Sequence, residues 1–311
     1  MNAAGRLGLY AAGLVVAFGA AYGVSSAVVP AGAAAAWQDS AGMDGHTEAG
    51  QAPAEAALPG LSLSSGGYLL SPVTASGSVG EAGTLSFRVL DSDGSPVTGF
   101  ETSHEKDLHL IVVRSDGSEF THAHPGLDLS TGTWSTPWQW KAAGTYRVYA
   151  DFVPAGDNTE RMTLSRTIEV AGTVTPARAM QTRTTDEVDG FVVSLDGQLT
   201  AGQSQELAIT VSRDGAPVTT LQPYLGAFGH LVVLRDGDLA YLHVHAEGQD
   251  PEAGQTAGPT ISFAAEAPTA GRYLLYLDFQ VDGQVHTAEF VLDATTGEPA
   301  GGHDDPMTPK R

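Results

Sequence analysis

Cysteine is absent from the 311-residue sequence. Its absence excludes disulfides, thiolate zinc sites, iron–sulfur clusters and a cysteine nucleophile. It also excludes a blue-copper electron carrier, because that centre requires a copper–thiolate bond. Any metal that this chain binds must therefore be held by other side chains.

Basic residues are scarce as well. The chain has 15 lysines and arginines against 36 aspartates and glutamates, a formal net charge of −21 with histidine neutral. A nucleic-acid binder needs a basic face to displace counterions from phosphates, and docking on anionic lipid needs a polybasic patch. The composition argues against both partners and leaves the N-terminal segment as the one candidate for membrane contact.

Residues 7–30 form a long apolar run in which Tyr10 and Tyr22 are the only ionisable side chains, with Arg6 as its positive flank. The run is long enough to span a bilayer as a helix, and its length favours an uncleaved anchor. The small residues at 31–36 also suit cleavage of a secretory signal. Because positive charge stays inside, both interpretations place the remainder outside the cytoplasm, either on a single-pass membrane protein or secreted.

The middle of the chain is an internal repeat. LHLIVVRSDGSEFTHAHPG and GTYRVYADF in the first copy correspond to GHLVVLRDGDLAYLHVHAEG and GRYLLYLDF in the second, and the alignment keeps a constant offset of 121 from Gly94 through Gly126. Each copy has the size of a small domain, which indicates a duplication of whole domains. The predicted organisation is a signal peptide or membrane anchor (1–37), a flexible tether (38–57), a first repeat (58–172), a linker (173–186), a second repeat (187–293) and a disordered tail (294–311).

Both copies have the pattern of β-strands. Their segments are rich in β-branched residues and broken by Asp-Gly turns, and no helical pattern longer than a turn or two follows the N-terminal segment. The predicted fold is all-β, with two tandem antiparallel β-sandwich domains that are immunoglobulin-like or cupredoxin-like. Alternation places four matched pairs on one side of a strand: Tyr146 and Tyr273, Val148 and Leu275, Ala150 and Leu277, Phe152 and Phe279.

Six of the ten histidines form two matched triplets with the spacing His-x12-His-x-His. The His-x-His step puts two imidazoles on one face of a strand, and the preceding strand supplies the third. Cross-strand neighbours lie about 5–8 Å apart, which is metal-chelating reach. We therefore predict one metal site in each repeat. The predicted ligands are His109, His122 and His124 in the first repeat, and His230, His243 and His245 in the second.

Two hairpin registers would bring the first triplet together. A loop of two or four residues centred on Asp116-Gly117 puts His109 opposite His124 and Ile111 opposite His122. A centre one residue earlier puts His109 opposite His122 instead. A three-residue loop would turn one strand over and separate the rings.

Two aligned carboxylates are further candidates. Asp151 and Asp278 occupy the same place in the Tyr-x-x-Tyr-x-Asp-Phe block of each copy. Each is either a fourth ligand or a partner that orients an imidazole, and the alternative is a strand-end aspartate bound to backbone or solvent. His104 aligns with Leu225, so it is either an auxiliary ligand of the first copy or a surface residue.

Imidazole ligands, with or without a carboxylate, suit Cu(II) and Zn(II), and the divalent series favours copper, with zinc as the alternative. The predicted function is binding, buffering or delivery of the metal, with a membrane metal transporter or another exported protein as partner. The chain carries no Ser–His–Asp signature, phosphate loop or His-Glu-x-x-His motif, so we predict no enzymatic activity. The alternative function is a non-catalytic adhesion or assembly module with incidental histidines.

The blocks HEKDLHLIVV, FTHAHPG and GTYRVYADFVPAG, with YLGAFGHLVVLRDGDLAYLHVHAEG, carry a family resemblance over residues 60–293. They resemble bacterial, especially actinobacterial, exported or membrane-anchored proteins, some described as heavy-metal-associated, and the small Ig-like/YtkA-like extracytoplasmic β-domains. The resemblance implies an extracytoplasmic β-sandwich and a link to metals. Two departures matter: Ala246 replaces Pro125 in the second copy, and no thiol-bearing metal-binding domain accompanies the repeats. The second departure weakens a role in metal transfer.

Overall fold

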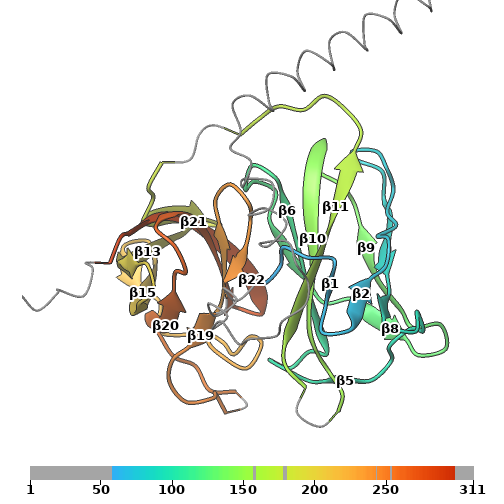
Figure 1. Ribbon diagram of the computed structural model, residues 1–311. Helices are drawn as coiled ribbons and strands as arrows, with labels where there is room; N and C mark the ends of the chain where they lie inside the picture. Colours follow the sequence, from blue (N-terminus) through green and yellow to red (C-terminus); the bar gives the residue numbers. More distant parts are fainter. Residues whose placement is uncertain (1–57, 157–158, 178–180, 243, 253, 298–311) are drawn as a thin grey trace, which may run out of the picture. The chain divides into compact units, whose positions relative to one another are not determined.

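The computed structural model describes residues 58–156, 159–177, 181–242, 244–252 and 254–297. Within these ranges, no helix has the length and apolar character needed to cross a membrane. The predicted signal or anchor, the tether and all but the first few residues of the tail lie outside the described residues. The described part of the chain is all-β, and each repeat is a mainly antiparallel sandwich of two layers (Figure 1).

In the first repeat, one layer is the sheet β11-β10-β6-β7, with β5 paired to β10. The facing layer contains the sheets β3-β9-β8 and β1-β2-β4. The strands are β1 (Ser64–Ser65), β2 (Tyr68–Leu70), β3 (Gly83–Phe87), β4 (Val89–Leu90), β5 (Phe100–Glu101), β6 (Leu108–Arg114), β7 (Thr121–Ala123), β8 (Gly126–Asp128), β9 (Thr133–Trp138), β10 (Gly144–Pro154) and β11 (Met162–Val170).

The second repeat repeats this plan. One layer is β14-β22-β21-β17-β18, and the facing layer is β12-β13-β15-β20-β19, with β16 paired to β15. The strands are β12 (Thr185–Val188), β13 (Phe191–Gly197), β14 (Leu199–Thr200), β15 (Ser204–Arg213), β16 (Ala216–Pro217), β17 (His230–Arg235), β18 (Tyr241–Leu242), β19 (Val244–Ala246), β20 (Thr260–Glu266), β21 (Gly271–Val281) and β22 (Gln284–Thr295).

The core of each sandwich follows the alternation read from the sequence. Tyr146, Val148, Ala150 and Phe152 of β10 all lie in the first core. Their counterparts in β21 lie in the second core. Because side chains on a strand alternate between its two faces, the residues between them are directed to the other face of the same sheet.

The second repeat begins earlier and ends later than predicted. Strand β12 starts at Thr185, inside the segment 173–186 expected to be a linker, and Arg183 already exchanges backbone hydrogen bonds with Val291 of β22. Strand β22 continues to Thr295, beyond the expected boundary at 293. Both extensions have the same cause, since the backbone at each end of the repeat finds a hydrogen-bonding neighbour within the sandwich.

A third apolar cluster joins the two repeats. The described residues form one compact unit. The sheet containing β6 and β10 packs, through the face turned away from its own core, against the corresponding face of the sheet containing β17 and β21. The buried members of this cluster are Ile111, Val113, Tyr149, Val232, Leu234, Leu239, Tyr241, Leu274, Tyr276 and Val291.

The aligned residues Tyr149 and Tyr276 make reciprocal hydrogen bonds across this contact. The Tyr149 hydroxyl donates a 2.6 Å hydrogen bond to the carbonyl oxygen of Leu239, and the Tyr276 hydroxyl donates a 2.6 Å hydrogen bond to that of Gly117. Each tyrosine thus reaches the hairpin turn of the other repeat. The aligned strands β6 and β17 lie at the centre of this contact, with both faces covered.

Candidate metal centre

His109 and His230 occupy equivalent ends of the two central strands. On β6, Leu108 and Leu110 face the sandwich core, so His109 and Ile111 face the other repeat. His109 is 1% exposed. On β17 the same alternation turns His230 toward the first repeat. The two rings stack with centroids 5.4 Å apart and an interplanar angle of 2°.

His122 and His124 join these two rings from the neighbouring strand. Strand β7 pairs with β6 so that Ile111 lies opposite His122, which is the first of the two registers considered above. The His122 centroid lies 5.3 Å from that of His109 and 4.9 Å from that of His230. The His124 centroid lies 5.1 Å from His109 and 4.7 Å from His122. These four residues are called the imidazole cluster below.

The second triplet does not gather in the same way. His230 joins the first triplet, His243 lies outside the described residues, and His245 is an exposed residue of β19. Strand β19 pairs with β20 in the other layer of the sandwich, with His245 opposite Ala264. Among the described residues, the structure therefore gathers one group of imidazoles shared between the repeats, and the second predicted centre, which includes His243, stays a prediction.

Pro125 is one of several differences between the copies at the point where their paths diverge. Proline has no backbone N–H, so Pro125 cannot donate to a ladder, and strand β8 begins only at Gly126. In the second copy Ala246 occupies this position and pairs with Phe263 in β20. The second copy therefore enters the layer that contains β20 at an earlier position, and His245 lies in that layer.

Asp278 contacts the cluster across the repeat boundary. Its Oδ2 lies 2.7 Å from Nδ1 of His122, and its Oδ1 accepts a 2.6 Å hydrogen bond from Thr287. The backbone register puts Asp278 opposite His230 of its own repeat. The carboxylate therefore orients an imidazole, but the imidazole belongs to the other repeat.

Asp151 does not take the same part, although it lies opposite His109 in the register. Its Oδ2 accepts a 2.5 Å hydrogen bond from the Arg161 guanidinium, and its Oδ1 accepts a 2.9 Å hydrogen bond from Thr163. Burial raises the pKa of this carboxyl, and the charge of Arg161 opposes that shift. The oxygens of Asp151 contact Arg161 and Thr163 in this structure, and its role as a ligand or as a partner that orients one stays a prediction.

The hydrogen-bond network assigns the tautomers of two rings. The carbonyl oxygen of Ser103 lies 3.0 Å from Nε2 of His109, so this nitrogen carries the proton and Nδ1 presents a lone pair. The carboxylate of Asp278 accepts from Nδ1 of His122, which leaves Nε2 with the lone pair when that ring is neutral. These two lone-pair nitrogens face each other at 3.1 Å. Either a proton or a metal cation must lie between them.

Burial keeps the other rings neutral. Burial, followed by the charge of His122, lowers the pKa of His109 to about 3 and that of His124 to about 3. The same causes lower the pKa of His230 well below its usual value. A neutral imidazole is the form that ligates metal, so near pH 7 these three rings are ready for coordination.

The distances fit a transition-metal ion. His109, His122 and His230 each offer a nitrogen, and the three nitrogens lie within 4.8 Å of one another. Metal–imidazole bonds of ~2.0–2.1 Å place ligand nitrogens ~2.9–4.2 Å apart. Nε2 of His124 is also buried, with no hydrogen-bond partner among the described residues. Side-chain shifts of under ~1 Å would bring the three nitrogens into coordinating range.

Sequence reasoning missed the sharing of the site, although the sequence carries a signal for it. LHLIVV and HLVVL are apolar on both faces, whereas one sheet of an isolated sandwich exposes its outer face to water. An outer face of Ile111, Val113, Val232 and Leu234 requires a cover, and the other repeat is that cover. The roles of Ser103 and Arg161 carry no comparable pattern in the sequence.

Comparison with family models gives one match, to a domain of unknown function, DUF8832, over residues 66–172 and 186–296. The chain belongs to the DUF8832 family. The two matched segments correspond to the two sandwiches, so each repeat is one DUF8832 domain. A comparison with curated protein sequences finds no match.

Comparison with solved structures gives matches that include three bacterial proteins. The adhesin InvE of Yersinia pseudotuberculosis has 12% identity and a TM-score of 0.22, over 75% of this chain and 60% of that one. Domains 4 and 5 of the S-layer protein SbsC have 13% identity and a TM-score of 0.21, over 69% and 82%. Invasin, a bacterial integrin-binding protein, has 12% identity and a TM-score of 0.22, over 74% and 39%. At these scores the likenesses carry no argument, and the function is argued below from the site itself.

Proposed function

We propose that this chain is a non-catalytic, extracytoplasmic pair of immunoglobulin-like modules that binds one transition-metal ion, copper, at the imidazole cluster. One observation carries the proposal. His109 Nδ1 and His122 Nε2 lie 3.1 Å apart, inside a group of buried and partly buried imidazoles drawn from both repeats.

The donor set favours copper over other biological divalent ions. Imidazole nitrogen suits Cu(II) and Zn(II), and the divalent series places Cu(II) affinity above Zn(II) affinity for a given set of ligands. The hydrogen bond from His122 to Asp278 fixes the ring and increases its basicity, as expected for a partner behind a metal ligand. Zinc is the alternative ion.

The burial of the cluster favours a role in binding the ion over a role in catalysis. A catalytic metal keeps an open position for water or substrate. Here the ring of His109 and the side chain of His122 are each 1% exposed. The proposed role is therefore binding, buffering or delivery outside the cytoplasm, in exchange with a membrane metal transporter or another exported protein.

Calorimetric titration of the full chain with Cu(II), and separately with Zn(II), tests the proposal. We expect one ion per chain, tighter binding of Cu(II), and loss of binding in His122→Ala. His286→Gln is a suitable control, because His286 pairs with Asp189 at 2.8 Å and not with the cluster. Two equal sites per chain would contradict a shared centre, and wild-type binding no stronger than that of His122→Ala would contradict metal binding.

The second candidate function is an adhesion or assembly module in which the histidines serve only to seal the contact between repeats. The hydrogen bonds of His109 to His122 and of His122 to Asp278 favour it, because a protonated His122 would satisfy both. In that case chelator treatment and added copper would leave the unfolding midpoint unchanged.

A further inference from the structure

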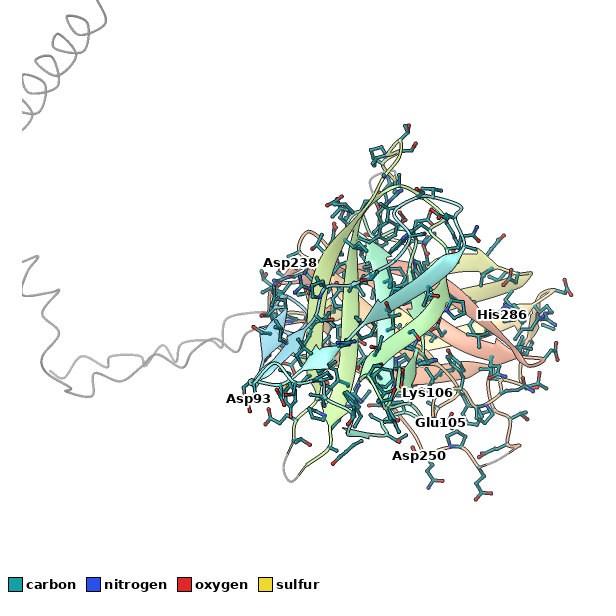
Figure 2. The ribbon with its side chains drawn as sticks, turned by 90° about the vertical axis from the view of Figure 1, so that its right-hand side faces the viewer. Asp93, Glu105, Lys106, Asp238, Asp250 and His286 are labelled. Carbon is teal, nitrogen blue, oxygen red and sulfur yellow. The ribbon has the colours of Figure 1, made fainter. Side chains whose placement is uncertain are left out.

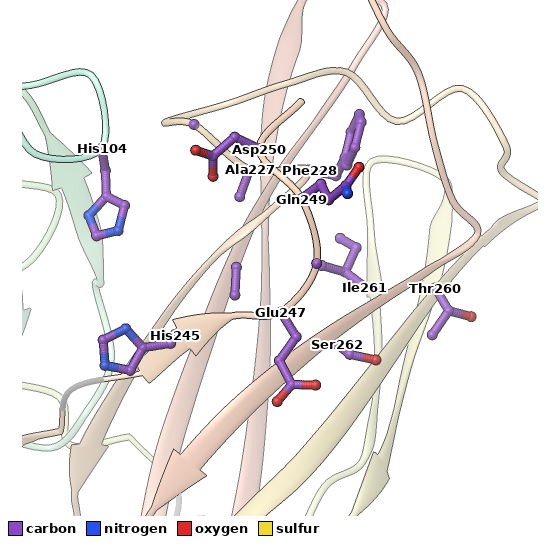
Figure 3. A pocket seen from close by; sticks show the side chains of 13 residues that line it. His104, Ala227, Phe228, His245, Glu247, Gln249, Asp250, Thr260, Ile261 and Ser262 are labelled. Carbon is purple, nitrogen blue, oxygen red and sulfur yellow. The ribbon is translucent and has the colours of Figure 1, made fainter. Parts of the chain in front are cut away.

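A pocket lies directly beside the imidazole cluster. It has a volume of about 410 Å³ and is lined by His104 of the first repeat and by residues of the second. Figure 3 shows side chains of the second repeat that line it, including His245, Glu247 and Asp250. These three residues are exposed, and Figure 2 shows Asp250 at the same edge of the molecule as Glu105 and Lys106. This pocket is called the access pocket below.

One ring separates the access pocket from the cluster. The centroid of His104 lies 5.6 Å from that of His230 and 6.0 Å from that of His109. The Arg161 guanidinium, whose charge is balanced by Asp151, lies 3.3 Å from Nδ1 of His104 and helps to hold the ring there. A solute that leaves the pocket past His104 therefore meets the imidazole cluster next.

The pocket side chains have the chemistry needed to receive a hydrated divalent cation. An imidazole and two carboxylates are the ligands that such an ion meets most readily at a protein surface. Burial lowers the pKa of His104, the charges of Arg161 and His245 lower it further, and the charge of Asp250 raises it. Both His245 and Asp250 thus lie close enough to His104 to act on it electrostatically.

We propose that the access pocket is the port through which the metal ion enters and leaves the imidazole cluster, with His245 and Asp250 receiving the ion and the His104 ring standing between them and the cluster. This inference rests on the proposed function. It explains how an ion reaches buried rings without separation of the two repeats. It also assigns a role to His245 of the second triplet, which would bind the ion before the ion reaches the imidazole cluster.

Stopped-flow measurement of Cu(II) uptake by the full chain, with release measured into excess chelator, tests the port. In the double variant His245→Gln/Asp250→Asn, we expect the association and dissociation rate constants to fall together by about 10-fold, with an unchanged Kd. Both rate constants should change by the same factor, because a port lowers the barrier to entry of the ion and the barrier to its release equally. Asp196→Asn, which removes an exposed charge of the same repeat outside the pocket, should leave both rates unchanged.

His104→Asn provides a second test with the opposite sign. His104 has a φ of 49°, a left-handed conformation that asparagine tolerates well. A smaller side chain at this position should raise both rate constants by a common factor.

Unchanged rates in the double variant, or a fall in affinity without a fall in the association rate, would overturn the port while leaving the proposed function intact. Slower exchange in His104→Asn would overturn the position assigned to its ring. A wild-type chain that takes up no Cu(II) at all would overturn the proposed function and the port together.

Discussion

The two repeats share a fold and a histidine pattern, yet they contribute unequally to the site. The first supplies His109, His122 and His124 to the cluster, whereas the second supplies His230 and directs His245 into the access pocket. The difference originates at the point where the chain crosses from one layer of the sandwich to the other. Equivalent histidines in duplicated domains can therefore acquire different tasks without any change in the histidines themselves.

Removal of a ring from the centre should have the largest effect. We expect His122→Ala to lower Cu(II) affinity by more than ~100-fold, because loss of an orienting partner alone costs ~10–100-fold and this change removes a ligand as well. His245→Ala should leave the affinity unchanged while slowing exchange. Competition with a chelator of known affinity measures both variants, and equal losses of affinity would remove the distinction between the repeats.

The second-largest effect should be a difference in Cu(II) affinity between substitutions of the two aligned aspartates. Asp278→Asn is expected to weaken Cu(II) binding by ~10–100-fold, because His122 loses its carboxylate partner. Asp151→Asn should leave the affinity nearly unchanged and lower the free energy of unfolding by ~1–3 kcal/mol, because it weakens the contact with Arg161.

Chelator competition and urea unfolding on the same two proteins separate these effects. A loss of affinity in Asp151→Asn equal to that in Asp278→Asn would show that the carboxylates act symmetrically.

Acid should destabilise the metal-free protein through the cluster. The pKa values of His109 and His124 are about 3 in the folded chain, against about 6.5 when unfolded. Below pH 6.5 the unfolded chain therefore binds protons that the folded chain does not. Each such ring should lower the free energy of unfolding by ~1.4 kcal/mol per pH unit as the pH falls, with no contribution above pH 6.5.

Urea unfolding between pH 7.5 and pH 5 measures this slope. His109→Gln should reduce the slope by the contribution of one ring, ~1.4 kcal/mol per pH unit. An identical slope in wild type and variant would show that the ring is not held neutral by its surroundings.

The smallest effect tests the origin of the asymmetry. Pro125→Ala restores a backbone N–H and allows the first copy to join its outer sheet earlier, as the second copy does. A backbone change of this kind is worth ~0.4–1 kcal/mol, so Cu(II) affinity should fall by ~2–5-fold as His124 is drawn from the cluster. Titration of this variant beside wild type measures it, and an unchanged affinity would show that Pro125 does not set the path.

Periodicity in the sequence was sufficient to predict the two sandwiches and the face on which His109 and His122 lie. Strand alternation is local, so it is legible in YRVYADF and LHLIVV without knowledge of the partner strands. The docking of the repeats was not predicted, although the apolar outer faces of β6 and β17 signal it. The partner of Asp278 could not be predicted, because its contact with His122 depends on tertiary packing between segments far apart in the sequence. The contact of Asp151 with Arg161 lies where β10 turns into β11, but alternation alone does not show which side chains meet there.

Electron paramagnetic resonance of the full chain loaded with one equivalent of Cu(II) tests the shared centre most directly, with wild type compared to His109→Gln and His230→Gln. The account predicts a single copper species coordinated by imidazole nitrogens from both repeats. Each variant should therefore alter the whole of the signal. A wild-type signal with two components, of which each variant removes one and leaves the other intact, would contradict a centre built jointly by the repeats.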